Sequence, residues 1–179
     1  MTILSLNECD LVWESASPEE SQRAGEILGG LLRPGDVVAL LGELGSGKTV
    51  LVRGIALGMG CDAGDVHSPS FTLINEYEGS ADRSLAGGRS RLAHMDLYRV
   101  QSEDEVFGIG WDHYVRAPFV VAVEWAERAL GWLPRDHLRV SLETLEACRR
   151  RLCVRATGPR SAELVRAWLT AGDFSVEAV

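Results

Sequence analysis

The chain has very little lysine and a shortage of positive charge overall. Lys48 is the only lysine, so arginine supplies the other seventeen of the eighteen Lys and Arg side chains, and the net charge is −8. An acidic balance of this size argues against a protein that grips nucleic acid through a general basic surface. It leaves open a role in a nucleic-acid pathway that is exercised through protein partners.

Paired cysteines and long apolar runs are also absent from the sequence. The four cysteines are scattered and form no C-x-x-C pair (Cys9, Cys61, Cys148 and Cys153). We therefore expect reduced thiols rather than a disulfide framework or a zinc site. No apolar run approaches membrane-spanning length, and the first residues lack the basic-then-apolar pattern of a signal peptide. These absences predict a cytoplasmic protein with no membrane association.

Length and composition are those of one globular domain. The hydrophobic fraction is 46% and the charged fraction is 25%, which are ordinary values for a folded protein that can bury a proper core. Strand-like segments alternate with helix-like segments, without a linker or an internal repeat. We therefore predict a single α/β domain over residues 1–179, with a P-loop NTPase-like fold and a mixed central sheet flanked by helices. Its core covers about 15–157, and a closing helix covers about 161–171.

The strongest functional signal lies between a strand-like run at 37–41 and a helical pattern that begins after residue 49. The intervening residues fit G-x-x-x-x-G-K-[ST], which is the phosphate-binding P-loop in the strand–loop–helix context that the pattern requires. They are Gly42, Glu43, Leu44, Gly45, Ser46, Gly47, Lys48 and Thr49. We predict that this loop and the adjoining Val50 bind ATP with Mg²⁺.

Each residue type in the loop has a physical reason to be there. Glycines have no Cβ, so the loop can wrap around an anion and point N–H groups at it. The following helix adds the positive end of its dipole. Lys48 can reach the outer phosphates, and the Thr49 hydroxyl can ligate Mg²⁺. A chain that otherwise uses only arginine has its one lysine where a compact ammonium suits phosphate.

Two acids at strand ends are candidates for the carboxylate that completes a P-loop site. Glu124 follows the apolar run Phe119–Val123, which is typical of a buried parallel strand. Asp96 ends a second strand-like run at 92–95. Ligands gather at the carboxyl ends of strands in such sheets, so both acids could face Lys48. Either acid could hold Mg²⁺ or position the attacking water, and the sequence leaves that choice open.

Other polar residues carry weaker signals. His94 can share the side of the strand on which Asp96 lies, although a packed or solvated histidine is the commoner outcome. Trp125 is expected to pack. The arginines at 149–151 read as a solvated strand edge or as a phosphate sensor. Residues 78–91 are polar and glycine-rich, and predict a mobile hairpin loop.

Flanking segments complete the pattern of alternating strands and helices. Short apolar stretches within residues 3–13 predict an edge strand. Ser17 followed by Pro18 and Glu20 predicts a helix start with a capping box. The alternating segments 138–143 and 152–157 can pair as a hairpin.

With these residues in hand, the chain resembles the TsaE family, the small P-loop ATPases of bacterial tRNA threonylcarbamoyladenosine biosynthesis. The likeness covers roughly residues 15–135. It rests on the P-loop and three further blocks in order, which are Ser68-Pro69-Ser70-Phe71, His94-Met95-Asp96-Leu97-Tyr98-Arg99 and Val123-Glu124-Trp125-Ala126-Glu127. The last two blocks in this order are much more specific than a P-loop alone. Ser46 and Ser70 stand where the family usually has Ala and Thr, and both changes are mild.

The resemblance implies roles for particular residues and partners. Lys48 would bind phosphate, Thr49 and Glu124 would hold Mg²⁺, and Asp96 would be needed for hydrolysis. Residues near Ser17 would touch the nucleotide base, and Arg150, beyond the matched blocks, is a further candidate contact. The protein would bind a TsaB–TsaD complex and keep it turning over through its ATP cycle, so tRNA would be involved only indirectly.

Slow ATP hydrolysis is the activity that these residues favour, with charge on the transferring phosphate stabilised by Lys48, the loop amides and Mg²⁺. The sequence offers no evident arginine finger, so a partner is expected to stimulate the reaction. One alternative is a small-molecule or nucleoside kinase with residues 78–91 as its lid. A second is a nucleotide-dependent binding switch with negligible turnover.

Overall fold

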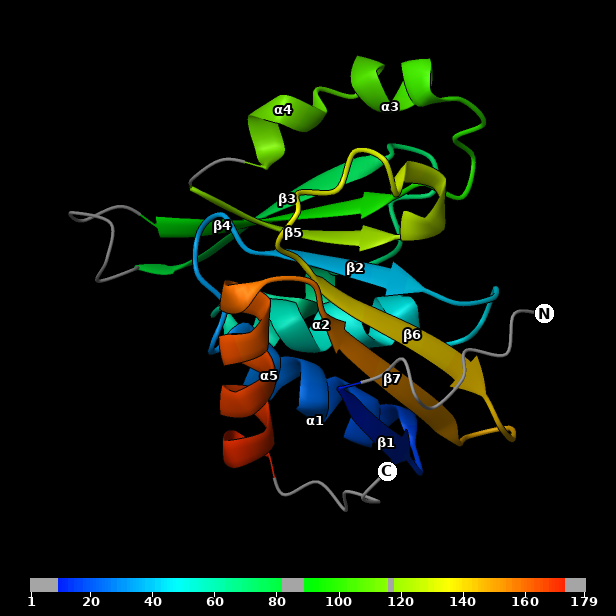
Figure 1. Cartoon of the computed structure of the whole chain (residues 1–179), viewed down its shortest axis with the longest axis vertical. Coiled ribbons are helices and arrows are strands. Elements are labelled where there is room, and N and C mark those ends of the chain that lie inside the picture. Colours follow the sequence, from blue (N-terminus) through cyan, green and yellow to red (C-terminus); the bar gives the residue numbers. More distant parts are fainter. Residues whose placement is uncertain (1–9, 82–88, 116–117, 173–179) are drawn as a thin grey trace.

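The computed structural model describes residues 10–81, 89–115 and 118–172, and these residues form a seven-stranded mixed sheet (Figure 1). The strand order is β1-β7-β6-β2-β5-β4-β3. Pairs β2–β5, β2–β6 and β4–β5 are parallel, and the pairs toward the two edges are antiparallel. The strands are β1 Leu11–Ser15, β2 Val37–Leu41, β3 Ile74–Ala81, β4 Arg89–Asp96, β5 Phe119–Glu124, β6 Leu138–Thr144 and β7 Arg150–Ala156.

Helices cover both faces of this sheet (Figure 1). On one face lie α1 (Pro18–Gly29), α2 (Lys48–Gly58) and α5 (Pro159–Ala171), and on the other lie α3 (Glu103–Gly108) and α4 (Trp111–Tyr114). Two short 3₁₀ turns complete the elements, η2 at Ala63–Asp65 and η3 at Ala126–Ala129. No helix in the described part of the chain is both long enough and apolar enough to cross a membrane. The predicted α/β fold with a mixed sheet is confirmed.

The central strands of the sheet are buried on both faces, which explains the apolar runs in their sequences. In β2, Val38 and Leu40 pack toward α1 and α2, whereas Val37 and Ala39 pack toward α3 and α4. All of β5 is buried because helices cover it on both sides. A central parallel strand therefore needs apolar side chains on both faces, which produces a continuous run instead of an alternating pattern.

The helix start predicted at Ser17 is confirmed. The Ser17 hydroxyl accepts a hydrogen bond from Glu20 N at 3.2 Å, and Pro18 occupies the first helical turn. The Glu20 carboxylate in turn accepts from Ala16 N at 2.7 Å, so the reciprocal cap reaches one residue further back than the usual capping box. The edge strand expected within residues 3–13 is present as β1, which extends to Ser15, and the residues before 10 lie outside the described part.

Two sequence-based expectations need correction. Residues 78–81 and 89–91 belong to strands β3 and β4 and are not loop, while 82–88 lie outside the described residues. Arg91 lies across the hairpin from two glutamates, 3.6 Å from Glu76 and 3.4 Å from Glu78. Polar side chains such as Glu78 and Arg91 suit the exposed part of this hairpin at the edge of the sheet, and they obscured the strand signal. Cys153 is disulfide-bonded, so the expectation of reduced thiols throughout was wrong at this position.

The contact between α1 and α2 is unusually close because glycines line it. A Cβ added at Gly54 would lie 2.0 Å from the carbonyl oxygen of Gln22, and one at Gly25 would lie 2.3 Å from that of Leu51. No real Cβ tolerates such distances, so the two backbones can touch only where side chains are absent. This contact supports the start of α2, which is also the end of the P-loop.

Candidate functional site

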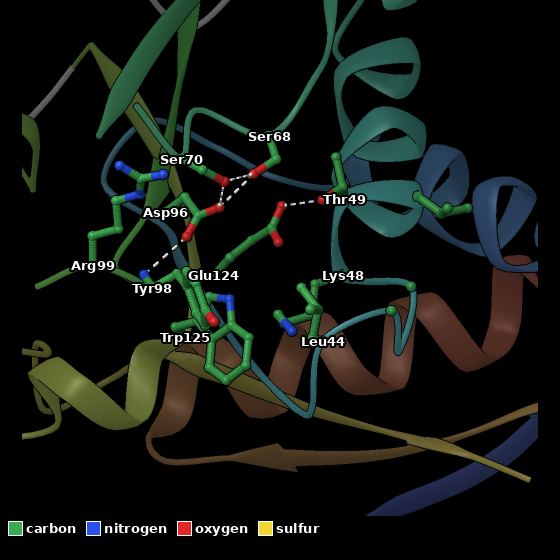
Figure 2. Close-up of a pocket in the computed structure, with 13 residues that line it drawn as sticks. Leu44, Lys48, Thr49, Ser68, Ser70, Asp96, Tyr98, Arg99, Glu124 and Trp125 are labelled. Carbon is green, nitrogen blue, oxygen red and sulfur yellow. Dashed lines mark hydrogen bonds between the residues drawn. The ribbon is translucent and has the colours of Figure 1, made fainter. Parts of the chain in front are cut away.

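A pocket of about 530 Å³ opens at the carboxyl ends of β2, β4 and β5 (Figure 2). The P-loop closes one side of it, because β2 ends at Leu41 and α2 begins at Lys48. Of the residues predicted for the site, the following line the pocket: Leu44, Gly45, Gly47, Lys48, Thr49, Val50, Asp96 and Glu124. The chain fold therefore brings the loop and both candidate acids together.

The P-loop backbone requires glycine at its two ends. Gly42 has φ 138° and Gly47 has φ 101°, and both values lie where side chains are disfavoured. A Cβ on Gly42 would also lie 2.4 Å from the carbonyl oxygen of Leu142 on β6. The loop is thus packed against the neighbouring strand, in a conformation that other residues would strain.

Lys48 is a buried cation whose partners are neutral. Its side chain is only 4% exposed, and Nζ donates to the carbonyl oxygens of Gly42 at 2.7 Å and Glu43 at 2.9 Å. Burial lowers the pKa of the ammonium, and the carboxylates of Glu124, Glu127 and Asp96 oppose that change. No carboxylate among the described residues lies within salt-bridge distance of Nζ. Because a buried charge normally needs a partner of opposite sign, this arrangement suits an anionic ligand.

Asp96 and Glu124 lie side by side at the ends of adjacent parallel strands. They are register partners in the β4–β5 pair and are 2% and 3% exposed. Thr49 Oγ1 donates to Glu124 Oε1 at 2.7 Å, which ties the start of α2 to β5. The arrangement places two carboxylates and one hydroxyl beside Lys48 (Figure 2).

The Asp96 carboxylate is held by donors on both oxygens. Oδ2 accepts from Ser68 Oγ and, at 2.8 Å, from Ser70 Oγ, and Oδ1 accepts from the backbone N–H of Tyr98 at 2.9 Å. His94, two residues earlier on β4, is completely buried, and its Nε2 lies 2.8 Å from Glu124 Oε1. His94 shares the side of the strand on which Asp96 lies, and it is also a packed histidine, which was the commoner of the expected outcomes.

Residues 15–152 match the model of the family described as "Threonylcarbamoyl adenosine biosynthesis protein TsaE". The chain belongs to the TsaE family. Its role therefore lies in tRNA threonylcarbamoyladenosine biosynthesis.

Individual TsaE relatives match over most of the chain. The tRNA threonylcarbamoyladenosine biosynthesis protein TsaE of Bacillus subtilis is 35% identical over 150 residues, which are 84% of this chain and 88% of the relative. That of Treponema pallidum is 38% identical over 140 residues, or 78% and 96% of the two chains. The crystal structure of Bacillus subtilis YdiB superposes with a TM-score of 0.71 at 30% identity, covering 89% of this chain and 94% of that one.

Five pocket residues were not predicted for the site from composition and pattern: Ser68, Ser70, Tyr98, Arg99 and Trp125. All of them fall within blocks that carry the resemblance to the TsaE family, so the sequence did mark them as a group. Trp125 was expected to pack, and it does so against the site, because its ring centroid lies 4.1 Å from Lys48 Nζ and 4.9 Å from the Tyr98 ring. The Arg99 guanidinium lies 4.2 Å from the ring centroid of Phe71, which is 85% exposed.

The remaining predicted residues lie behind or beside the pocket. Ser17 does not line it, since its hydroxyl caps α1. Arg150 does not line it either, but Nε donates to the carbonyl oxygen of Ser46 at 3.1 Å and Nη2 to that of Gly45 at 3.3 Å. Gly42 and Glu43 contribute the carbonyls that hold Lys48, and Ser46 is buried. Direct nucleotide contacts by Ser17 and Arg150 remain predictions.

The oxygen ligands available near Thr49 fit a Mg²⁺ ion that is bound together with a nucleotide. The described residues contain no group of three or more His, Cys, Asp or Glu side chains that could enclose a metal by themselves. Mg²⁺ at phosphate sites takes one or two carboxylates and fills its octahedron with phosphate oxygens and water. The Thr49 hydroxyl and the Glu124 carboxylate, 2.7 Å apart, provide such a partial set.

Proposed function

We propose that this TsaE-family protein binds ATP with Mg²⁺ and hydrolyses it slowly, and that its cycle acts on a TsaB–TsaD complex in tRNA threonylcarbamoyladenosine formation. The observation that carries the proposal is the meeting of Lys48, Thr49, Glu124 and Asp96 in one pocket (Figure 2). A tRNA-modification role also favours a cytoplasmic location. The net charge of −8 favours contact with protein partners over direct contact with tRNA.

Each residue in the pocket has a distinct part in the proposed reaction. Lys48 would leave its two carbonyl partners for the outer phosphates, and the Gly47 N–H would donate to them. Thr49 and Glu124 would hold Mg²⁺, which when bound neutralises charge on the phosphates. Asp96 would orient the attacking water, because its carboxylate is already fixed by two hydroxyls and one N–H. Trp125 would shield the ammonium from bulk solvent.

The contacts of the nearby arginines support the proposal that turnover is slow. Arg99 lines the pocket, but its guanidinium stacks on Phe71, and Arg150 holds carbonyls at the back of the P-loop. An arginine finger contributes about 10³–10⁵ in rate to such enzymes. We therefore expect a low basal rate that rises when a partner rearranges or completes the site.

The test is release of free phosphate from ATP, measured with and without an added TsaB–TsaD complex. We expect Mg²⁺-dependent hydrolysis that the complex stimulates, and equal rates with and without it would contradict the partner role. ATP consumption that yields a phosphorylated acceptor in place of free phosphate would identify a kinase. Nucleotide-dependent binding of the complex that survives Asp96→Asn, without turnover, would identify a binding switch.

A further inference from the structure

His94 is a buried polar residue that the proposed mechanism leaves unused. Its side chain is completely shielded from solvent, and Nε2 lies 2.8 Å from Oε1 of Glu124. The other ring nitrogen, Nδ1, is buried and has no hydrogen-bond partner in the described part of the chain. The ring centroid also lies 6.4 Å from that of Tyr77. The one polar contact that the described residues offer His94 is therefore a carboxylate of the nucleotide site.

Two donors converge on a single oxygen of Glu124. Thr49 Oγ1 approaches Oε1 from α2 at 2.7 Å, and His94 Nε2 approaches the same atom from β4. An ionised carboxylate only accepts hydrogen bonds, so Nε2 carries the proton in this contact. Oε1 is thereby held from two sides. Oε2 accepts no hydrogen bond from the described residues and is left for a metal ion or its water.

The strand register makes this contact possible. Asp96 pairs with Glu124 and His94 pairs with Ala122, so His94 lies two residues back on the same face of the sheet. Its ring therefore reaches Glu124 diagonally, and His94 does not itself line the pocket that Asp96 and Glu124 line.

We propose that His94 is a positioning residue that fixes the Glu124 carboxylate for Mg²⁺, an inference that rests on the proposed function. Hydrogen-bonded partners of metal ligands orient the ligand, and their loss typically weakens metal affinity or activity by about 10–100-fold. Without the histidine donor, the buried Glu124 carboxylate keeps only Thr49 among its described partners. The Glu124 carboxylate then rotates more freely, and Oε2 no longer points in a fixed direction.

Three substitutions at His94 distinguish the loss of the hydrogen-bond donor from a change in side-chain volume. In His94→Gln, the amide nitrogen can occupy the place of Nε2 and donate to Oε1. In His94→Asn, the amide ends near the place of Nδ1 and falls short of Glu124. His94→Leu fills the position with an apolar side chain and removes the donor. A role in packing alone would not rank Gln above Leu at a buried site.

The experiment measures the Mg²⁺ concentration that gives half of the thermal stabilisation at saturating ADP. Each variant is compared with the same variant in ADP without Mg²⁺, so differences in intrinsic stability cancel. We expect His94→Leu and His94→Asn to need about 10–100-fold more Mg²⁺ than the wild-type protein. We expect His94→Gln to stay close to wild type. The Mg²⁺ dependence of ATP hydrolysis should follow the same order.

The outcomes distinguish this inference from the proposed function. If the wild-type protein gains no Mg²⁺-dependent stabilisation from ADP, both fail. If the wild-type protein responds but His94→Leu has the same Mg²⁺ midpoint, only the role of His94 is overturned. The same holds if His94→Gln is as impaired as His94→Asn. Should His94→Leu fail to fold, the comparison of Gln with Asn decides by itself.

Discussion

The guanidinium of Arg150 donates from Nε to the carbonyl oxygen of Ser46 at 3.1 Å, although the two residues are 104 positions apart in the chain. Because a trans peptide is planar, fixing the Ser46 carbonyl on one side directs the N–H of Gly47 to the other. Arg150, at the start of β7, therefore fixes the backbone of the P-loop through this hydrogen bond. We therefore expect Arg150 to influence nucleotide binding through the loop, without direct contact with phosphate.

Arg150→Ala should weaken ADP binding about tenfold, which corresponds to about 1.4 kcal/mol, because the loop amides lose their fixed direction. Isothermal titration calorimetry measures the change. Arg149→Ala is the matched control, since among the described residues Arg149 forms ion pairs only with the partly exposed Glu14 and the exposed Glu146, at 2.6 and 3.1 Å. Exposed ion pairs contribute little, so this variant should bind ADP normally. Equal losses of ADP affinity in Arg150→Ala and Arg149→Ala would show that the effect comes from positive charge in general and not from the contact of Arg150 with the P-loop.

Lys48 should react with amine reagents at lower pH than an ordinary lysine. Burial disfavours the charged ammonium and lowers the pKa from 10.5, so the reactive neutral amine is populated at lower pH. Glu124→Gln removes a negative charge that raises this pKa, and the labelling midpoint should move lower still. Mass spectrometry reads the site directly, because the chain has no other lysine.

ATP with Mg²⁺ should protect Lys48 from that reagent. Bound phosphates would raise its pKa and cover Nζ, and both effects slow labelling. Unaltered labelling at Lys48 under saturating nucleotide would remove the basis for a phosphate site.

The two serines that bind Asp96 should be needed for turnover more than for nucleotide binding. Ser70→Ala removes a donor at 2.8 Å from Oδ2, and we expect kcat to fall about tenfold with little change in ADP affinity. Ser70→Thr keeps the hydroxyl and should retain activity. Asp96→Asn should lose at least about 100-fold. Steady-state kinetics with ADP calorimetry separates the two effects, and a parallel loss of ADP affinity would argue against a role confined to hydrolysis.

Gly54→Ala should destabilise the protein strongly. The added methyl would lie 2.0 Å from the Gln22 carbonyl oxygen and force α1 away from α2, at a cost of about 1–3 kcal/mol or more. Gly30→Ala is the control, because its φ of −68° suits alanine and the nearest atom is 3.6 Å away. That change should stabilise the fold by about 0.4–1 kcal/mol. Urea unfolding measures both, and equal effects would mean that the helix contact is looser than described.

Local sequence was enough to predict most elements of the fold. Apolar runs mark β2 and β5 because both faces of these strands are covered, and the Ser17 cap marks α1 because the signal lies within four residues. The edge hairpin β3–β4 was harder, since a strand that faces solvent carries polar residues. The order of strands in the sheet was not predictable, because it depends on pairings such as β1 with β7 between distant segments.

The candidate site was likewise predictable only where its signal is local in the sequence. The P-loop and the two strand-end acids follow from motif and position, and the structure brings them together. Ser68 and Ser70 lie in an irregular segment that has no periodicity to interpret. Their approach to Asp96 depends on Leu73, which has φ 66° and whose carbonyl oxygen accepts from Asp96 N at 3.0 Å. The contact of His94 with Glu124 depended on a register that pattern alone does not reveal.

The pairing of β4 with β5 also determines where relatives of this chain can differ in length. One residue inserted just before His94 would turn every later side chain of the strand over, sending both His94 and Asp96 toward α3. Residues inserted between Ala81 and Arg89 are added before the first residue of β4 and leave that alternation intact. Natural insertions and deletions should therefore collect between β3 and β4, while the last residues of β4 keep a constant spacing.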